Sequence, residues 1–213
     1  MRIQYNYVVI EGNIGAGKTT LATKIAEQFN ARLILERFSD NPFLPKFYSD
    51  PDKYSFPLEL SFLADRYRQL KEELVSPDLF KSFTVADYYF MKSLVFAAST
   101  LEGDEYNLYR QIFYIIYGSL PKPDLYVYLH LTPERLLKNI ARRGRTYESS
   151  ITTEYLKKVQ DNYFTFFRQN QENKYLVIDI SEIDFVENES HYMRLIDTIF
   201  FDNYPEGINK VIL

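Results

Sequence analysis

The chain has 213 residues, a length typical of one domain with a single large hydrophobic core. It contains no Cys, which excludes disulfides, thiolate metal sites and cysteine nucleophiles, and its two His leave little material for a zinc site. A formal net charge of -4 at pH 7 argues against a general binder of nucleic acid or of anionic membranes.

No apolar run is long enough to cross a membrane. The longest stretch without Asp, Glu, Lys or Arg covers residues 111–121, whereas a membrane-spanning helix needs about 20 apolar residues. The N-terminal residues have neither the apolar segment nor the small-residue cleavage site of a secretory signal. We therefore expect a cytoplasmic protein that does not contact a membrane.

Hydrophobic periodicity predicts helices and short strands along the chain. In chain order, we expect a strand at residues 5–10, a helix at 18–29, a strand at 32–35, an irregular segment at 39–53, a helix at 58–74 with Pro57 in its first turn, a strand at 83–87, helices at 88–101 and 105–117, a strand at 125–131, helices at 133–142 and 153–169, a strand at 175–180 and a helix at 191–201. Strands that are apolar on both faces indicate a parallel sheet between helical layers. The expected fold class is α/β, with residues 1–213 forming one domain.

A glycine-rich segment links the first strand to the first helix. It fits the pattern G-x-x-x-x-G-K-[ST], in which backbone N–H groups and a helix N-terminus bind phosphate. In this pattern the Lys18 ammonium contacts the β- and γ-phosphates, and the Thr19 hydroxyl binds Mg²⁺. The residues expected to hold the ATP phosphates are Gly12, Asn13, Ile14, Gly15, Ala16, Gly17, Lys18, Thr19 and Thr20.

Other motifs restrict the class of phosphate-loop protein. The D-x-x-G and N-K-x-D motifs of GTP-binding switches are missing, and Thr20 breaks the dinucleotide pattern G-x-G-x-x-G. A motor or assembly ATPase is normally a larger protein. Small kinases remain, in which an acceptor pocket and a basic lid accompany the phosphate loop.

Residues 142–150 are the predicted lid. Arg142, Arg143 and Arg145 surround Gly144, and guanidinium groups on a flexible turn can close over a transferring phosphoryl group. The alternative is a solvated basic helix end that complements the helix dipole.

Two carboxylates follow predicted strands. Glu36 comes after the second strand, at the sheet edge where the phosphate loop lies, and could accept the proton of an attacking hydroxyl. Asp87 ends the third strand and could bind Mg²⁺ directly or through water. The alternative for Glu36 is a surface ion pair with Arg37.

Several motifs together resemble the deoxynucleoside kinases, and most closely the bacterial deoxyguanosine/deoxyadenosine kinase branch. They are E-G-N-I-G-A-G-K-T-T at 11–20, the Glu after the second strand, N-P-F-L-x-x-F-Y-x-D at 41–50, P-K-P-D-L-x-V-Y-L at 121–129 and R-G-R-x-x-E at 143–148. The likeness runs from about residue 8 to residue 185. It implies a P-loop NTPase fold with a five-stranded parallel sheet, a homodimer, and transfer of the ATP γ-phosphoryl, with Mg²⁺, to the 5′-hydroxyl of a deoxyribonucleoside.

The resemblance assigns roles to individual residues. It implies that Glu36 is the general base, that Lys18, Arg143 and Arg145 act in catalysis, and that the substrate contacts Glu36, Tyr48, Glu59, Arg66, Asp87 and Glu148, with Thr19 and Asp87 at the metal. Within this set, Tyr48 and Glu148 correspond to the residues that hold the sugar 3′-hydroxyl. Spacing supports part of the assignment, because Glu59 and Arg66 lie two helical turns apart and share one helix face. An amphipathic helix with a surface ion pair would show the same spacing.

The base-binding pocket departs from the family pattern. The family usually carries E-R-S after the third strand, whereas this chain has Asp87 followed by Tyr88, without the Arg. Lys92 stands where an Asp is frequent and Glu59 where a Gln is common, so the base preference cannot be transferred beyond favouring a purine. Arg37 is a candidate for the missing positive charge.

Two alternative functions also remain open. A nucleoside monophosphate kinase of the thymidylate kinase type shares the loop and lid but needs extra cations for the acceptor phosphate, and a non-catalytic nucleotide-binding regulator needs neither a base nor a lid.

Aromatic residues on consecutive helices are candidates for the dimer face, namely Tyr89, Phe90, Phe96, Phe113, Tyr114 and Tyr117. We expect small-molecule partners, with no nucleic acid.

Overall fold

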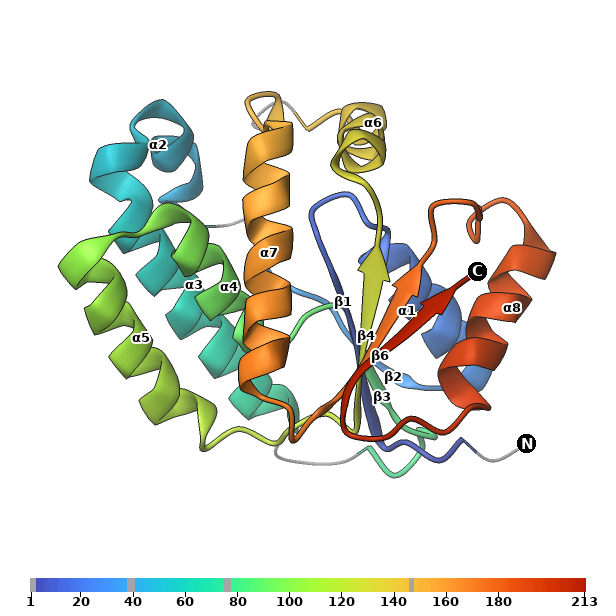
Figure 1. Cartoon of the computed structure of the whole chain (residues 1–213). Coiled ribbons are helices and arrows are strands. Elements are labelled where there is room, and N and C mark those ends of the chain that lie inside the picture. The colour runs from blue at the N-terminus through green and yellow to red at the C-terminus, as the bar shows by residue number, and fades with distance from the viewer. Residues whose placement is uncertain (1–2, 38–40, 75–77, 146–147) are drawn as a thin grey trace.

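The computed structural model describes residues 3–37, 41–74, 78–145 and 148–213, apart from the side chain of Tyr48. The described residues form a parallel sheet of six strands in the order β2-β3-β1-β4-β5-β6 (Figure 1). The strands are β1 (Tyr7–Gly12), β2 (Arg32–Ile34), β3 (Thr84–Ala86), β4 (Leu125–His130), β5 (Lys174–Asp179) and β6 (Gly207–Ile212). The helices are α1 (Lys18–Phe29), α2 (Leu44–Ser49), α3 (Pro51–Leu74), α4 (Met91–Thr100), α5 (Gly103–Tyr117), α6 (Pro133–Arg143), α7 (Thr153–Gln169) and α8 (Glu189–Phe200).

The sheet separates two hydrophobic clusters because successive strand residues point to opposite faces. Val8 and Ile10 of β1 pack in the cluster that includes residues of α1 and α8. Tyr7 and Val9 of the same strand pack in the cluster that includes residues of α3, α4, α5 and α7. Figure 1 shows these two helical layers on opposite sides of the sheet. The α/β prediction is confirmed.

The carboxyl ends of all six strands lie at one edge of the sheet because the strands are parallel. Val8 of β1 lies opposite Val85 of β3 and Leu125 of β4, so these three parallel strands are in register and end near one another. This is the upper edge in Figure 1, where α2 and α6 also lie. The phosphate loop, Glu36 and Asp87 all follow strands that end there, as predicted.

The sheet has one strand more than predicted. β6 lies beside β5 and pairs with it from Gly207 opposite Lys174 to Ile212 opposite Asp179. Its six residues, G-I-N-K-V-I, mix Ile and Val with Asn and Lys without regular alternation, and none of them is buried. An exposed edge strand of this kind carries a much weaker hydrophobic signal than the buried strands.

Residues 39–53 were expected to be irregular, and the described part is largely helical instead. α2 covers six of these residues, and α3 begins at Pro51, where a proline fits the first helical turn. Pro57 therefore lies inside α3, not in its first turn as expected. The helix continues past this proline because Ser55, Leu58 and Leu63 are buried.

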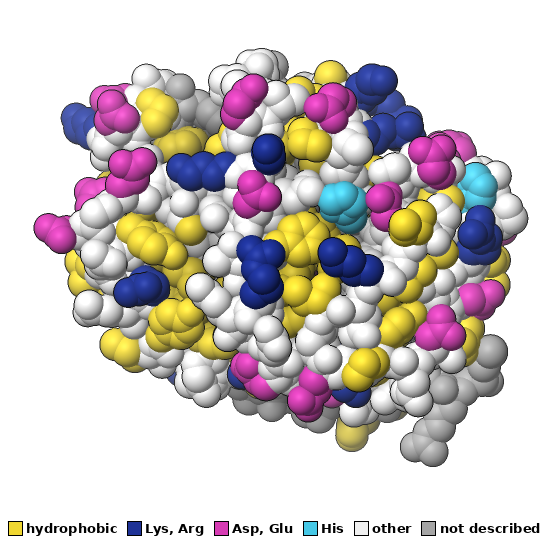
Figure 2. All heavy atoms as spheres, in the orientation of Figure 1, with side chains coloured by type: hydrophobic (Ala, Val, Ile, Leu, Met, Phe, Trp, Pro, Cys, Tyr) yellow, Lys and Arg dark blue, Asp and Glu magenta, His cyan; other side chains and the backbone are white. Residues whose placement is uncertain are grey.

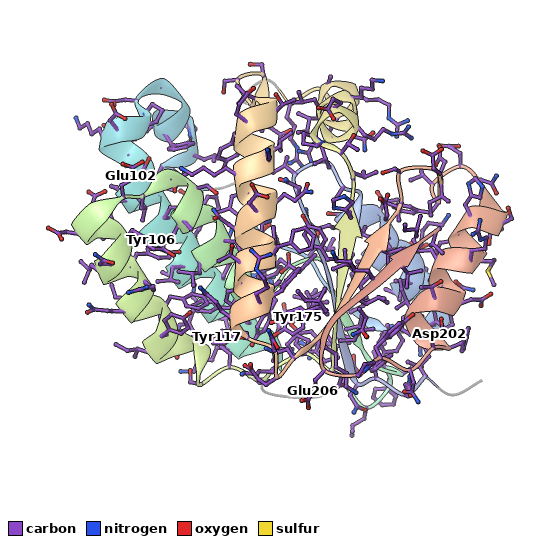
Figure 3. The ribbon with its side chains drawn as sticks, viewed as in Figure 1. Glu102, Tyr106, Tyr117, Tyr175, Asp202 and Glu206 are labelled. Carbon is purple, nitrogen blue, oxygen red and sulfur yellow. The ribbon has the colours of Figure 1, made fainter. Side chains whose placement is uncertain are left out.

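The predicted aromatic dimer face is wrong for four of its six residues. Tyr89, Phe90 and Phe113 have no exposed surface, and Tyr117 is almost fully buried. The Phe113 and Tyr117 rings stack at 5.2 Å inside the subunit. Figure 3 shows Tyr117 between the end of α5 and the sheet, on the side away from the site edge. These four aromatic side chains fill the core of one subunit, whereas Phe96 is half-buried and Tyr114 is exposed.

Among the described residues, no helix combines the length and apolar character required to span a membrane.

Candidate active site

The segment between β1 and α1 wraps tightly. Gly15 and Gly17 have φ values of 83° and 87°, in the left-handed region that L side chains rarely adopt. A Cβ at Gly17 would lie 2.8 Å from the Phe185 ring, so glycine is also required by space. The loop ends at the N-terminus of α1, whose dipole and unpaired N–H groups favour an anion.

Lys18 and Asn13 fix the shape of this loop. The Lys18 ammonium donates a hydrogen bond of 2.8 Å to the Asn13 carbonyl oxygen. The Asn13 amide group donates to the Leu156 carbonyl at 2.7 Å, which ties the loop to α7. Burial, together with the charge of Lys92, lowers the pKa of Lys18 to about 8. Phosphate oxygens would therefore stabilise a half-buried cation that lacks full solvation.

A cavity of about 480 Å³ lies between the phosphate loop, α6 and the segment after β5. Six of the nine predicted phosphate-binding residues line it, namely Gly15, Ala16, Gly17, Lys18, Thr19 and Thr20. Gly12 and Asn13 support the loop from outside this cavity, and Ile14 lines the neighbouring one. Asp184 and Phe185 close the far side.

Thr19 and Asp87 come together as predicted for a magnesium site. The Thr19 hydroxyl donates to the Asp87 carboxylate at 2.5 Å. The other Asp87 oxygen accepts from the Glu36 backbone N–H at 2.8 Å, which places the end of β3 beside the end of β2. One hydroxyl and one carboxylate fit Mg²⁺, which takes a few protein oxygens and completes its shell with phosphates and water. No cluster of three or more acidic, His or Cys side chains is present in the described ranges.

The lid arginines converge on one buried carboxylate. Arg143 ends α6 and makes a bidentate contact with Glu148, whose oxygens lie 2.5 and 2.6 Å from its Nη2. Arg145 also contacts Glu148, at 3.4 Å. The left-handed φ of 73° at Gly144 makes the turn between them. Figure 2 shows Lys and Arg side chains gathered over α6. Thr146 and Tyr147 lie outside the described residues.

A second cavity, of about 160 Å³, adjoins the first. The two cavities share five lining residues: Gly15, Lys18, Thr19, Arg143 and Arg145. Four of the six predicted substrate residues line the second cavity, namely Glu36, Glu59, Arg66 and Glu148. Asp87 lies just outside, bonded to Thr19 and to the Glu36 backbone. Tyr48 lies in α2, and its side chain is outside the part that the structure describes.

Glu36 is held between two buried cations. Its carboxylate accepts from the Arg66 guanidinium at 2.8 Å and from the Lys92 ammonium. Burial would raise the pKa of Glu36, but Lys92 and Arg66 outweigh it and lower that pKa to about 2. Glu36 is therefore ionised throughout the physiological pH range.

Lys92 is a site residue that sequence reasoning did not assign. It was noted only as a departure from the family pattern, yet it supplies the positive charge beside Glu36. Arg37, the candidate for that charge, instead lies 3.3 Å from Glu73, and its side chain is 70% exposed. Among the two neighbours, only Glu36 lines the smaller cavity.

Glu11 is a second residue that was not assigned, although it opens one of the quoted motifs. It is fully buried behind the phosphate loop and accepts from the Tyr89 backbone N–H at 2.8 Å and from the Tyr163 hydroxyl at 2.9 Å. Burial raises its pKa to about 7, against the opposing charges of Lys92 and Lys18. A charged residue inside an otherwise apolar strand was the available sequence signal.

Comparison with known proteins gives a consistent picture. The family model described as deoxynucleoside kinase matches residues 8–202. The chain is 37% identical to a deoxyguanosine kinase from Bacillus subtilis over 89% of this chain and 93% of that protein. It is 30% identical to a deoxyadenosine kinase from Dictyostelium discoideum over 99% of this chain and 90% of that protein.

Solved structures share the fold. A structure of deoxyadenosine kinase from M. mycoides with bound dATP matches with a TM-score of 0.77 and 23% identity, over 91% of this chain and 98% of that chain. The P-loop fold is thereby confirmed, with six strands in place of the five expected. The family match also sets aside the thymidylate kinase and non-catalytic alternatives. This chain therefore belongs to the deoxynucleoside kinase family of enzymes, which phosphorylate deoxynucleosides with ATP.

Proposed function

We propose that this enzyme transfers the γ-phosphoryl group of ATP, with Mg²⁺, to the 5′-hydroxyl of a purine deoxynucleoside. The observation that carries the proposal is the junction of the two cavities at Lys18, Thr19, Arg143 and Arg145, with Glu36 lining the second cavity. A triphosphate in the larger cavity would end where an acceptor in the smaller one begins. The similarity to a deoxyguanosine kinase and a deoxyadenosine kinase supports a purine as the base.

Glu36 would accept the hydrogen bond of the 5′-hydroxyl. Its low pKa makes it a weak base, which suits phosphoryl transfer because the loose transition state demands orientation of the nucleophile more than early removal of its proton. Arg66 and Lys92 keep the carboxylate ionised and directed.

Lys18, Arg143 and Arg145 would neutralise charge on the transferred group. Thr19 and Asp87 would hold Mg²⁺, which adds positive charge at the β- and γ-phosphates. Glu148 holds both lid arginines and keeps oxygen lone pairs for a further donor, so it could join the lid to the sugar 3′-hydroxyl. Tyr48 is the proposed partner of Glu148 at that hydroxyl.

The activity test uses purified protein, ATP, Mg²⁺ and each of the four natural deoxynucleosides. We expect one deoxynucleoside 5′-monophosphate for each ADP formed, fastest with a purine. Phosphorylation of a deoxynucleoside monophosphate but of no deoxynucleoside would contradict the proposal. ADP formed at one rate with and without an acceptor would contradict it as well.

The oligomeric state and location also belong to the proposal. We propose a cytoplasmic homodimer of one-domain subunits spanning residues 1–213, as the family resemblance implies. Sedimentation of the purified protein tests the dimer directly, and a monomer at micromolar concentration would contradict it.

A further inference from the structure

One acceptor in the smaller cavity has no partner. Glu59 lines this cavity and is 3% exposed, and none of the described residues donates a hydrogen bond to its Oε2 atom. A buried oxygen of this kind loses its hydration without compensation. Such an atom in a ligand cavity indicates that the ligand supplies the missing donor.

The groups around Glu59 leave its Oε2 atom able to accept a hydrogen bond. The Thr100 hydroxyl donates to the other oxygen, Oε1, at 2.9 Å. The Tyr109 hydroxyl contacts the main-chain carbonyl of Glu59 at 3.3 Å, not its carboxyl group. The cations Arg66 and Lys92 face Glu59 as well, but Lys92 donates to Glu36, and Arg66 donates to Glu36 and to the Ser93 hydroxyl. The carboxyl of Glu59, a residue of the cavity lining, thus keeps acceptor capacity on both oxygens.

The cavity walls fit a flat aromatic ligand. Phe62 and Phe96 line it from α3 and α4, and each ring also lies against one of the two cations. A base placed among these rings would present its hydrogen-bonding edge to Glu59, since all three side chains line one small space.

We propose that Glu59 selects guanine, because guanine alone among the four DNA bases carries two adjacent N–H donors, N1–H and the 2-amino group, on one edge. An ionised carboxylate offers two acceptors in the matching arrangement. Adenine and cytosine place a ring-nitrogen acceptor next to an amino donor and would face the carboxylate with a lone pair. The inference deepens the proposed function, on which it rests.

The base preference should also depend on the ionisation state of Glu59. Burial raises the pKa of Glu59 to about 7, while Arg66, Thr100 and Lys92 act in the opposite direction. Ionised Glu36 and the Tyr109 hydroxyl are the other titratable groups nearby. Protonated Glu59 offers one donor and one acceptor, which fits adenine. Preference for guanine should therefore weaken as the pH falls from 8 to 6.

The first experiment uses the wild-type enzyme with deoxyguanosine, deoxyinosine and deoxyadenosine at pH 8. Deoxyinosine keeps N1–H and lacks the 2-amino group. We expect kcat/KM to fall about tenfold from deoxyguanosine to deoxyinosine, since a hydrogen bond to a charged group is worth about 1.5–3 kcal/mol, and further for deoxyadenosine. Equal values for deoxyguanosine and deoxyadenosine would overturn the inference.

The second experiment uses Glu59→Gln, in which the amide replaces one acceptor with a donor at nearly constant volume. We expect the deoxyguanosine/deoxyadenosine ratio of kcat/KM to fall by about tenfold to a hundredfold. Glu73→Gln is the matched control, because it removes a carboxylate from the same helix outside both cavities. An unchanged ratio in folded Glu59→Gln protein would overturn the inference.

Proton linkage measured by calorimetry supplies a readout that a purely structural role would not move. Near pH 7, binding of deoxyguanosine should release a fraction of a proton and binding of deoxyadenosine should take one up. Both exchanges should disappear in Glu59→Gln. Proton exchange that is equal for the two nucleosides would contradict the proposal.

The experiments separate the two levels of inference. An enzyme that phosphorylates no deoxynucleoside disproves the proposed function. An enzyme that phosphorylates deoxynucleosides with a base preference insensitive to Glu59→Gln disproves only the role of Glu59.

Discussion

The two cavities are built in different ways. The proposed nucleotide cavity takes its proposed phosphate-binding residues from one continuous segment, Gly15 to Thr20, which offers backbone amides and the α1 N-terminus. The acceptor cavity takes its side chains from the end of β2, from α3 and α4, and from the lid. Its centre is an ion network of Glu36, Arg66 and Lys92. A local loop specifies the donor, whereas long-range packing specifies the acceptor.

Because the two cavities are built from different segments, we expect mutations on the nucleotide side and on the acceptor side to change activity to different extents. The largest loss should come from the nucleotide side with Lys18→Ala, which removes the positive charge facing the phosphates. We expect kcat to fall by about 10³-fold or more, because one preorganised charge contact is worth about 10²–10³ and the Lys also shapes the loop through Asn13. Steady-state kinetics measures the effect, and circular dichroism should show an unchanged fold. Retention of a tenth of the activity would contradict the assigned role.

Glu36→Gln should give the next largest loss, on the acceptor side. We expect kcat to fall by about 10²–10⁴-fold, since the variant cannot accept the hydroxyl hydrogen as a carboxylate does. It should also unfold more readily by about 3 kcal/mol, because Arg66 and Lys92 stay buried without their counter-charge. Kinetics and urea unfolding check the two effects. A kcat near the wild-type value would show that Glu36 is not the acceptor-activating group.

Arg143→Ala probes the junction between the cavities. We expect kcat to fall about tenfold to a hundredfold with a small change in KM, because the contact strengthens as charge is redistributed in the transition state. Arg142→Ala is the control, since Arg142 lines only the nucleotide cavity. Equal effects of the two variants would mean that the junction has no special role.

The smallest effect concerns stability rather than turnover. Glu11 has its pKa raised to about 7 by burial, so the folded protein binds its proton more tightly than the unfolded chain does. The free energy of unfolding should therefore decrease as the pH rises from about 4.5 to about 7. Glu11→Gln should reduce this decrease by about 1–2 kcal/mol, measured as the difference between pH 5 and pH 8 by urea unfolding. Parallel pH profiles for both proteins would contradict the assignment.

Local regularities explain which elements could be predicted. Buried strands such as β1 and β4 are almost wholly apolar, and α1 and α7 have clear helical periodicity, so α1, α7 and β4 lie within one residue of the prediction and β1 lies two residues later than expected. The edge strand β6 and the short helix α2, with Pro45 in its first turn, give mixed local signals, and their structure depends on β5 and α3 beside them. The site residues also divide into those that belong to a local motif and those that only tertiary contacts bring together. Lys18 and Thr19 belong to a short motif, while Lys92 and Glu36 are separated by 56 residues.

By itself, the sequence determined the phosphate loop, the basic lid segment and the alternation of strands and helices, because each depends on residues close together in the chain. Only the tertiary structure decided that Lys92 balances Glu36, that Glu148 holds both lid arginines and that Glu59 keeps an unpartnered oxygen in the acceptor cavity. The physical reason is that burial and charge pairing depend on which helices the sheet brings together, and no local pattern in the chain encodes those distances.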